Sequence, residues 1–133
     1  MKFVEEKKEL YFENEKRSSF LYEGIIIVSW KRGVDITEED AKDTMLYAVD
    51  HYMPGGKLMP TMVDLTLINS MTRESREYFQ NTNTSTSTAL ALVVSSTLSR
   101  VIGNIFLSMN QSGIPLKLFN TRDQALEWLR NYP

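Results

Sequence analysis

Short apolar runs alternate with amphipathic stretches along most of this chain, and this alternation limits the folds open to it. The runs 25–30, 60–65, 89–94 and 114–119 are rich in the β-branched and aliphatic residues that suit a buried strand. The stretches between them have apolar residues at helical spacing. Strands that alternate with helices pair in parallel through right-handed crossovers, so the pattern predicts an α/β fold.

The first third of the chain predicts an antiparallel addition to this sheet. Residues 10–12 are a strand candidate, and the runs 19–22 and 25–30 flank Glu23-Gly24, a two-residue turn whose glycine accepts a positive φ. We therefore expect a mixed sheet of about five strands with about four helices. The chain has 133 residues and no linker-like stretch, so we expect one domain over residues 1–133.

Capping signals place the helices. Thr37 and Asp40 have the spacing of a capping box, and Ser70 or Thr72 is positioned to cap the next helix. The run 81–88 consists of Asn, Thr and Ser, so we expect a solvated loop there. In the helix after the strand 89–94, the periodicity predicts a buried face made of Leu98, Val101, Ile102, Ile105 and Met109.

Composition and charge exclude several classes of function. The chain has no cysteine and one histidine, which excludes thiolate nucleophiles and multi-histidine metal sites. The net charge is −2 at pH 7, so no basic excess favours nucleic-acid binding. Neither a nucleophile with its base nor a glycine-rich phosphate loop is recognisable. We expect no enzymatic activity, no cofactor and no metal.

The same sequence predicts no membrane span. Its longest uninterrupted apolar stretch, residues 89–94, is far shorter than the ~20 residues of a membrane helix. Its first residues mix acidic and basic side chains and lack the apolar core of a signal peptide. We therefore expect a cytoplasmic protein.

The segment 64–72, taken with the order of the elements, resembles the STAS family of SpoIIAA-like anti-sigma-factor antagonists. In that family a strand ends in an Asp-Leu-Ser segment, and a serine after a second Asp is phosphorylated by a partner kinase. Here Asp64 matches the first Asp, Thr66 replaces the serine, Asn69 stands for the second Asp and Ser70 falls on the modified serine. The glycine that follows the serines in the family is missing.

This resemblance implies a SpoIIAA-like fold and a non-enzymatic regulatory module. The implied partner is a protein, such as a kinase-type regulator, and the implied phosphorylation and partner-binding residues are Ser70, Asp64, Thr66 and Asn69. A second copy of the chain is the other partner we expect, through the open edge of the predicted hairpin or through the helix that carries Phe106.

The segments 91–96, 99–104, 115–119 and 125–129 resemble small bacterial proteins grouped as STAS/SEC14-like. This second resemblance implies the same fold and an alternative function, that of a carrier for a small apolar ligand or lipid. Methionine adapts to varied apolar ligands. We expect such a pocket to be lined by Met45, Met53, Phe106, Met109 and Trp128.

Polar residues also follow the strand 89–94. In open α/β sheets, ligands bind outside the carboxyl ends of the parallel strands. We expect the polar residues that follow the strand 89–94 to lie at the same rim of the sheet as the segment 64–70. Together with two helix N-termini, they are expected to bind an anion. The alternative is that the hydroxyls only cap helices. The candidate ligand residues are Ser95, Ser96, Thr97, Arg100 and Asn104.

Overall fold

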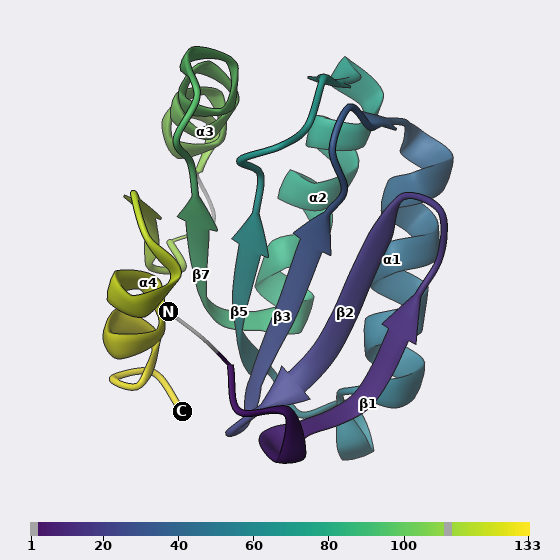
Figure 1. Ribbon diagram of the computed structural model, residues 1–133, viewed down its shortest axis with the longest axis vertical. Helices are drawn as coiled ribbons and strands as arrows, with labels where there is room; N and C mark the ends of the chain where they lie inside the picture. Colours follow the sequence, from purple (N-terminus) through teal and green to yellow (C-terminus); the bar gives the residue numbers. More distant parts are fainter. Residues whose placement is uncertain (1–2, 111–112) are drawn as a thin grey trace.

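A six-stranded mixed sheet organises the chain in the computed structural model, which describes residues 3–110 and 113–133, with the backbone alone for 83–85 (Figure 1). The first three strands pair antiparallel and the others pair parallel. In spatial order they are β1 (Lys8–Glu13), β2 (Arg17–Tyr22), β3 (Ile25–Trp30), β5 (Met59–Asp64), β7 (Ser87–Val93) and β8 (Leu116–Phe119).

Helices cover both faces of this sheet. One face packs against α1 (Glu38–His51), α2 (Arg73–Thr86) and α3 (Thr97–Met109), and the other against α4 (Arg122–Leu129). Within β7, Leu90 and Leu92 point to the first layer, whereas Ala89 and Ala91 point to α4. A strand buried on both faces reads as a continuous apolar run, which is what residues 89–94 show.

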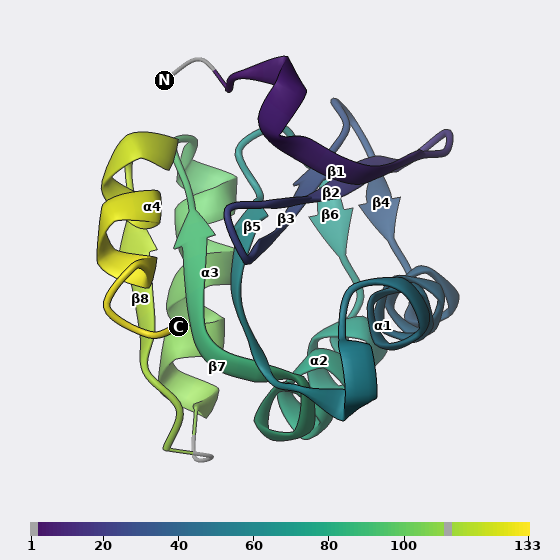
Figure 2. The same ribbon diagram turned by 90° about the horizontal axis from the view of Figure 1, so that it is seen from below.

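The carboxyl ends of the parallel strands meet at one rim. Ser29 of β3 pairs with Asp64 of β5, and Asp64 pairs with Val93 of β7. Beside this rim, β4 (Asp35–Ile36) and β6 (Ser70–Met71) form a short parallel ladder, visible side by side in Figure 2. Each loop that carries candidate site residues therefore starts from the same end of the sheet.

Most expected elements are confirmed. The observed six strands are close to the expected five, and the described residues contain the expected four α-helices. Glu23-Gly24 turns between β2 and β3, with a φ of 51° at Glu23 and 79° at Gly24. Thr37 caps α1 in a full capping box with Asp40.

The loop predicted for residues 81–88 is wrong. Helix α2 continues to Thr86, and β7 begins directly at Ser87. The Thr82 hydroxyl donates to the Tyr78 carbonyl at 2.8 Å and the Thr86 hydroxyl donates to the Thr82 carbonyl at 3.1 Å, so both hydroxyls are satisfied inside the helix. Packing against the sheet thus overrides the low helix propensity of this run.

The buried face predicted for α3 is also largely wrong. Ile102 is buried, but Leu98 and Val101 are 41% and 51% exposed. The helix instead buries Ser99, Ile102, Gly103 and Phe106. A Cβ at Gly103 would lie 3.0 Å from Leu118 Cδ2 and 3.1 Å from Val94 Cγ1. The helix therefore turns toward the sheet the face that carries its smallest residue, Gly103.

We therefore expect Gly103→Val to destabilise the fold by about 2 kcal/mol, because its branched side chain has to displace Leu118 and Val94. Asn104→Val is the matched control, since Asn104 is the next residue of α3 and is exposed. The measurement is urea-induced unfolding. Equal midpoints for the two variants would show that α3 does not pack closely.

Candidate functional site

Asp64 ends β5 in an internal ion pair. Its side chain is buried, Oδ2 accepts from Arg122 Nε at 2.8 Å, and Oδ1 accepts from the Thr66 amide at 2.9 Å and the Thr66 hydroxyl at 2.7 Å. Arg122 Nη2 also donates to Ser29 Oγ at 2.8 Å. Asp64 therefore joins the first residue of α4 to β3 and β5 and fixes the start of the loop to Ser70.

Ser70 and Asn69 meet at the carboxylate of Asp35. Ser70 Oγ donates to Asp35 Oδ1 at 2.6 Å, and Asn69 Nδ2 donates to the same oxygen at 2.8 Å. These hydrogen bonds, from Ser70 first and then Asn69, hold the pKa of Asp35 below its ordinary value, so Asp35 is ionised at neutral pH. Lys16 Nζ donates to the Asp35 carbonyl at 3.1 Å and to Asp40 Oδ2 at 2.6 Å.

Ser70 does not cap the following helix. It lies in β6, paired with Asp35 of β4, and the cap of α2 is Thr72, whose hydroxyl accepts from the Ser75 amide at 3.1 Å. The β4–β6 ladder takes up residues 70 and 71, so the helix begins only at Arg73. Of the two caps that the sequence allowed, the structure uses the second.

Within the polar group after β7, the side chain of Ser96 caps α3. Ser96 Oγ accepts from the Ser99 amide at 3.0 Å, and the Ser95 and Ser96 amides donate to Ser99 Oγ at 3.0 Å. Arg100 Nη2 donates to Asn120 Oδ1 at 2.6 Å, beyond the end of β8. The side chains of Ser95, Ser96, Thr97, Arg100 and Asn104 are all exposed.

The two groups of candidate residues share a rim without touching. β5 and β7 are neighbours, and the Leu65 amide donates to the Val93 carbonyl at 2.9 Å, as expected for adjacent strand ends. Within residues 3–110 and 113–133, however, no hydrogen bond joins Asn69 or Ser70 to the polar group after β7. Ser70 turns toward Asp35, on the β3 side of the rim.

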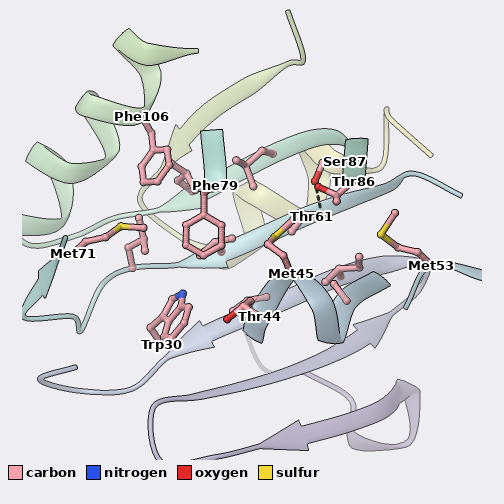
Figure 3. A pocket seen from close by; sticks show the side chains of 17 residues that line it. Trp30, Thr44, Met45, Met53, Thr61, Met71, Phe79, Thr86, Ser87 and Phe106 are labelled. Carbon is pink, nitrogen blue, oxygen red and sulfur yellow. Dashed lines mark hydrogen bonds between the residues drawn. The ribbon is translucent and has the colours of Figure 1, made fainter. Parts of the chain in front are cut away.

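An apolar cavity of about 60 Å³ lies between the sheet and the helices α1 and α2 (Figure 3). Of the residues expected to line a pocket, Met45, Met53 and Phe106 do so. Trp128 does not, because α4 lies on the opposite face of the sheet, where Trp128 packs against Phe119 and Tyr132; Met109 does not line it either.

The serine and threonine hydroxyls that line this cavity are already hydrogen-bonded. Thr44 Oγ1 donates to the Asp40 carbonyl at 2.7 Å, and Thr61 and Ser87 share a hydroxyl hydrogen bond of 3.1 Å, drawn in Figure 3. An apolar cavity of roughly 150 Å³ holds a benzene molecule. The present volume therefore admits a few carbon atoms, and a long lipid tail requires α1 and α2 to move apart.

Sequence reasoning missed Asp35 and Arg122. Asp35 lies 35 residues from its partner Ser70, and Arg122 lies 58 residues from its partner Asp64. No local spacing signals either contact. A distant ion pair is visible only once the strand order is known.

Two findings concern the described residues as a whole. No helix among them is both long and apolar enough to cross a membrane. No cluster of three or more His, Asp or Glu side chains in this part of the chain could hold a metal ion.

Comparison with known proteins identifies the family and supports the fold. Residues 19–133 match the family model described as Domain of unknown function (DUF7793). No curated protein matches the chain.

Two solved structures are similar. One is an uncharacterized protein of the DUF3478 family with a SpoIIAA-like fold from Shewanella loihica PV-4, with a TM-score of 0.58, 14% identity and coverage of 90% of each chain. The other is an anti-sigma factor antagonist from Mycobacterium paratuberculosis, with a TM-score of 0.59, 18% identity and coverage of 86% of this chain and 92% of that chain. At these identities the likeness shows the SpoIIAA-like fold alone, which confirms the expected fold.

We expect Arg122→Met to cost about 1–3 kcal/mol of unfolding free energy, because it leaves the buried Asp64 carboxylate without its cation. Arg130→Met is the control: Arg130 pairs with Glu23 at 3.7 Å between exposed side chains, and loss of such a pair costs less than about 0.5 kcal/mol. Thermal or urea unfolding measures both. Equal effects would mean that the Asp64 pair does not hold the rim together.

Proposed function

This chain belongs to the family described as Domain of unknown function (DUF7793), and we propose that it is a non-enzymatic regulatory module that binds a protein partner at the rim around Ser70. The SpoIIAA-like fold supports this proposal, because one protein of similar structure is an anti-sigma factor antagonist. We propose that the chain works as one domain and that its partner is a kinase-type regulator. Ser70, Asp64, Thr66 and Asn69 are the residues proposed to serve phosphorylation and partner binding.

The observation that carries this proposal is the contact of Ser70 with Asp35. The Ser70 hydroxyl is partly exposed, lies 2.6 Å from an ionised carboxylate and joins two short strands. A phosphoryl group at this oxygen adds about −1.5 to −2 charges. It replaces a donating hydroxyl with an anion next to Asp35, so the contact turns from attractive to repulsive.

Lys16 is the cation placed to respond. Its ammonium binds the Asp35 carbonyl and the Asp40 carboxylate, which forms the capping box of α1. A phosphate on Ser70 competes with Asp40 for Lys16, so the modification weakens the β4–β6 ladder and loosens the start of α1. We propose that the partner distinguishes these two states of the rim.

The test is phosphate mapping by mass spectrometry after the protein is incubated with ATP and an extract of its source cells. We expect phosphate on Ser70, lost in Ser70→Ala and retained in the control Ser108→Ala, which removes another exposed hydroxyl. Phosphate that never reaches Ser70, although other proteins in the extract are labelled, would contradict the switch.

The edge of the sheet is a surface through which two copies of the chain could pair. β1 is one of the two edge strands of the sheet, and its Leu10 and Tyr11 side chains are exposed. An open edge strand can pair with another chain. Self-association through β1 is therefore the alternative partner arrangement within this proposal.

A second candidate function is favoured by the cavity. A pocket lined by Trp30, Met45 and Phe79 suits the body of a small apolar ligand, and we propose a carrier of such a ligand as the alternative. Native mass spectrometry of freshly purified protein measures this directly. A bound apolar molecule that disappears in Ala48→Phe, which fills the cavity, is expected; a clean mass under gentle ionisation would count against a carrier.

A further inference from the structure

Trp30 ends β3 with its indole ring inside the apolar layer of the fold. Only 3% of its surface is exposed, and the ring forms part of the wall of the cavity between the sheet and the helices α1 and α2. The indole Nε1–H is a hydrogen-bond donor that cannot accept. A buried tryptophan usually gives this donor a partner, so an unpaired one requires an explanation.

The indole N–H of Trp30 has no partner in the protein. Within residues 3–110 and 113–133, no hydrogen bond joins this nitrogen to an acceptor. The nitrogen is not sealed in either, because the buried side-chain atoms that lack both a partner and solvent-accessible surface belong, among the described residues, to Arg17. Figure 3 shows the Trp30 nitrogen, in blue, turned toward Met71 and Phe79, which also line the cavity. The unpaired donor therefore points into the cavity.

The rest of the lining indicates a neutral ligand. Four hydroxyls line the cavity and already form hydrogen bonds, those of Thr44, Thr61, Thr86 and Ser87. Of the residues that the structure describes, none with a charged side chain lines it. A charged group in this place would lose its hydration without gaining a counter-ion, which is costly. One free donor therefore calls for one neutral acceptor.

An acceptor oxygen on an apolar body fits this arrangement better than a water molecule does. An ordered buried water needs two to four polar partners, whereas the cavity provides one free donor beside hydroxyls that are already hydrogen-bonded. A carbonyl oxygen donates nothing and is satisfied by a single N–H. Ligand pockets have this composition, with mostly apolar walls and a few polar groups that fix the orientation of the ligand.

We propose that the cavity binds a small neutral carbonyl compound, such as a short ketone, whose oxygen accepts the Trp30 Nε1–H and whose alkyl groups lie among the apolar side chains. This inference rests on the proposed carrier function and names its ligand class. The cavity of about 60 Å³ sets the size of the ligand at a few carbon atoms, because benzene occupies an apolar cavity of roughly 150 Å³.

The experiment compares butan-2-one with 2-methylbut-1-ene, which has the same shape but a methylene group in place of the oxygen. Binding is followed by NMR of protein with ¹⁵N-labelled indole groups, which belong to Trp30 and Trp128. We expect butan-2-one to move the Trp30 indole proton downfield, as a new hydrogen bond does, and the alkene to cause no such shift. Trp128 lies on the α4 face and is the internal control, expected to be unchanged by both compounds.

Trp30→Phe removes the donor and keeps an aromatic ring. The measure is the ratio of the dissociation constants of the two compounds, because the change in cavity volume affects both. We expect the variant to weaken butan-2-one at least about tenfold relative to the alkene, since the oxygen loses its one hydrogen bond. Titrations follow the ¹³C-labelled methyl groups of Met45, Met53 and Met71, which line the cavity. Trp128→Phe is the matched control and is expected to keep the ratio.

Each outcome decides between the carrier function and its ligand class. Binding of both compounds without a shift of the Trp30 indole proton, and with the same ratio in Trp30→Phe, would overturn the assignment and leave the carrier function standing. Binding of the alkene alone would do the same, and binding of neither compound would overturn both. If Trp30→Phe does not fold, benzothienylalanine replaces Trp30 in a Trp128→Phe background, with sulfur in place of the N–H. An unchanged ratio would then overturn the assignment, and a loss of about tenfold would support it.

Discussion

Parallel pairing of β3, β5 and β7 is the constraint on which the rest of this structure depends. It brings Ser29, Asp64 and Val93 to one rim in direct register. Asp64 then accepts Arg122 from α4 and Thr66 from its own loop, so one carboxylate fixes both the α4 layer and the path toward Ser70. The short β4–β6 ladder closes this path through the contact of Ser70 with Asp35.

The two faces of the sheet have different characters. The α4 face is closely packed, with Ala89 and Ala91 of β7 against Ala125 and Leu126 of the helix. The opposite face contains the cavity and the buried Arg17, so it combines unfilled apolar volume with unsatisfied donors. Such features lower stability in the absence of a ligand, and they are concentrated in the layer formed by α1 and α2.

Local chemistry made much of the fold predictable. The Thr37 capping box, the Glu23-Gly24 turn and the apolar run of β7 depend on residues close in sequence, and the structure confirms each of them. The expected approach of the two strand ends followed from parallel pairing and is also observed.

The predictions that were wrong concern features that depend on contacts between residues far apart in the sequence. The buried face of α3 is set by the distance to Leu118 and Val94, which favours Gly103 over the larger apolar residues of the same helix. Most of the Asn-Thr-Ser run is helical despite its low helix propensity, and the Thr82 and Thr86 hydroxyls are satisfied by carbonyls of that helix. The partner of Ser70 could not be foreseen either, because Asp35 lies 35 residues away in a two-residue strand without hydrophobic periodicity.

The central claim is that the Ser70–Asp35 contact holds the rim closed. The most direct measurement is amide hydrogen exchange by NMR at Ile36 of β4 and at Thr72, whose amide donates to the Ile36 carbonyl at 3.0 Å. It is made on protein carrying phosphoserine at position 70 by incorporation during synthesis. The account predicts exchange at least about tenfold faster at both amides than in the unmodified protein, with the β7 amides unchanged. Equal protection of Ile36 and Thr72 in the two forms would contradict it.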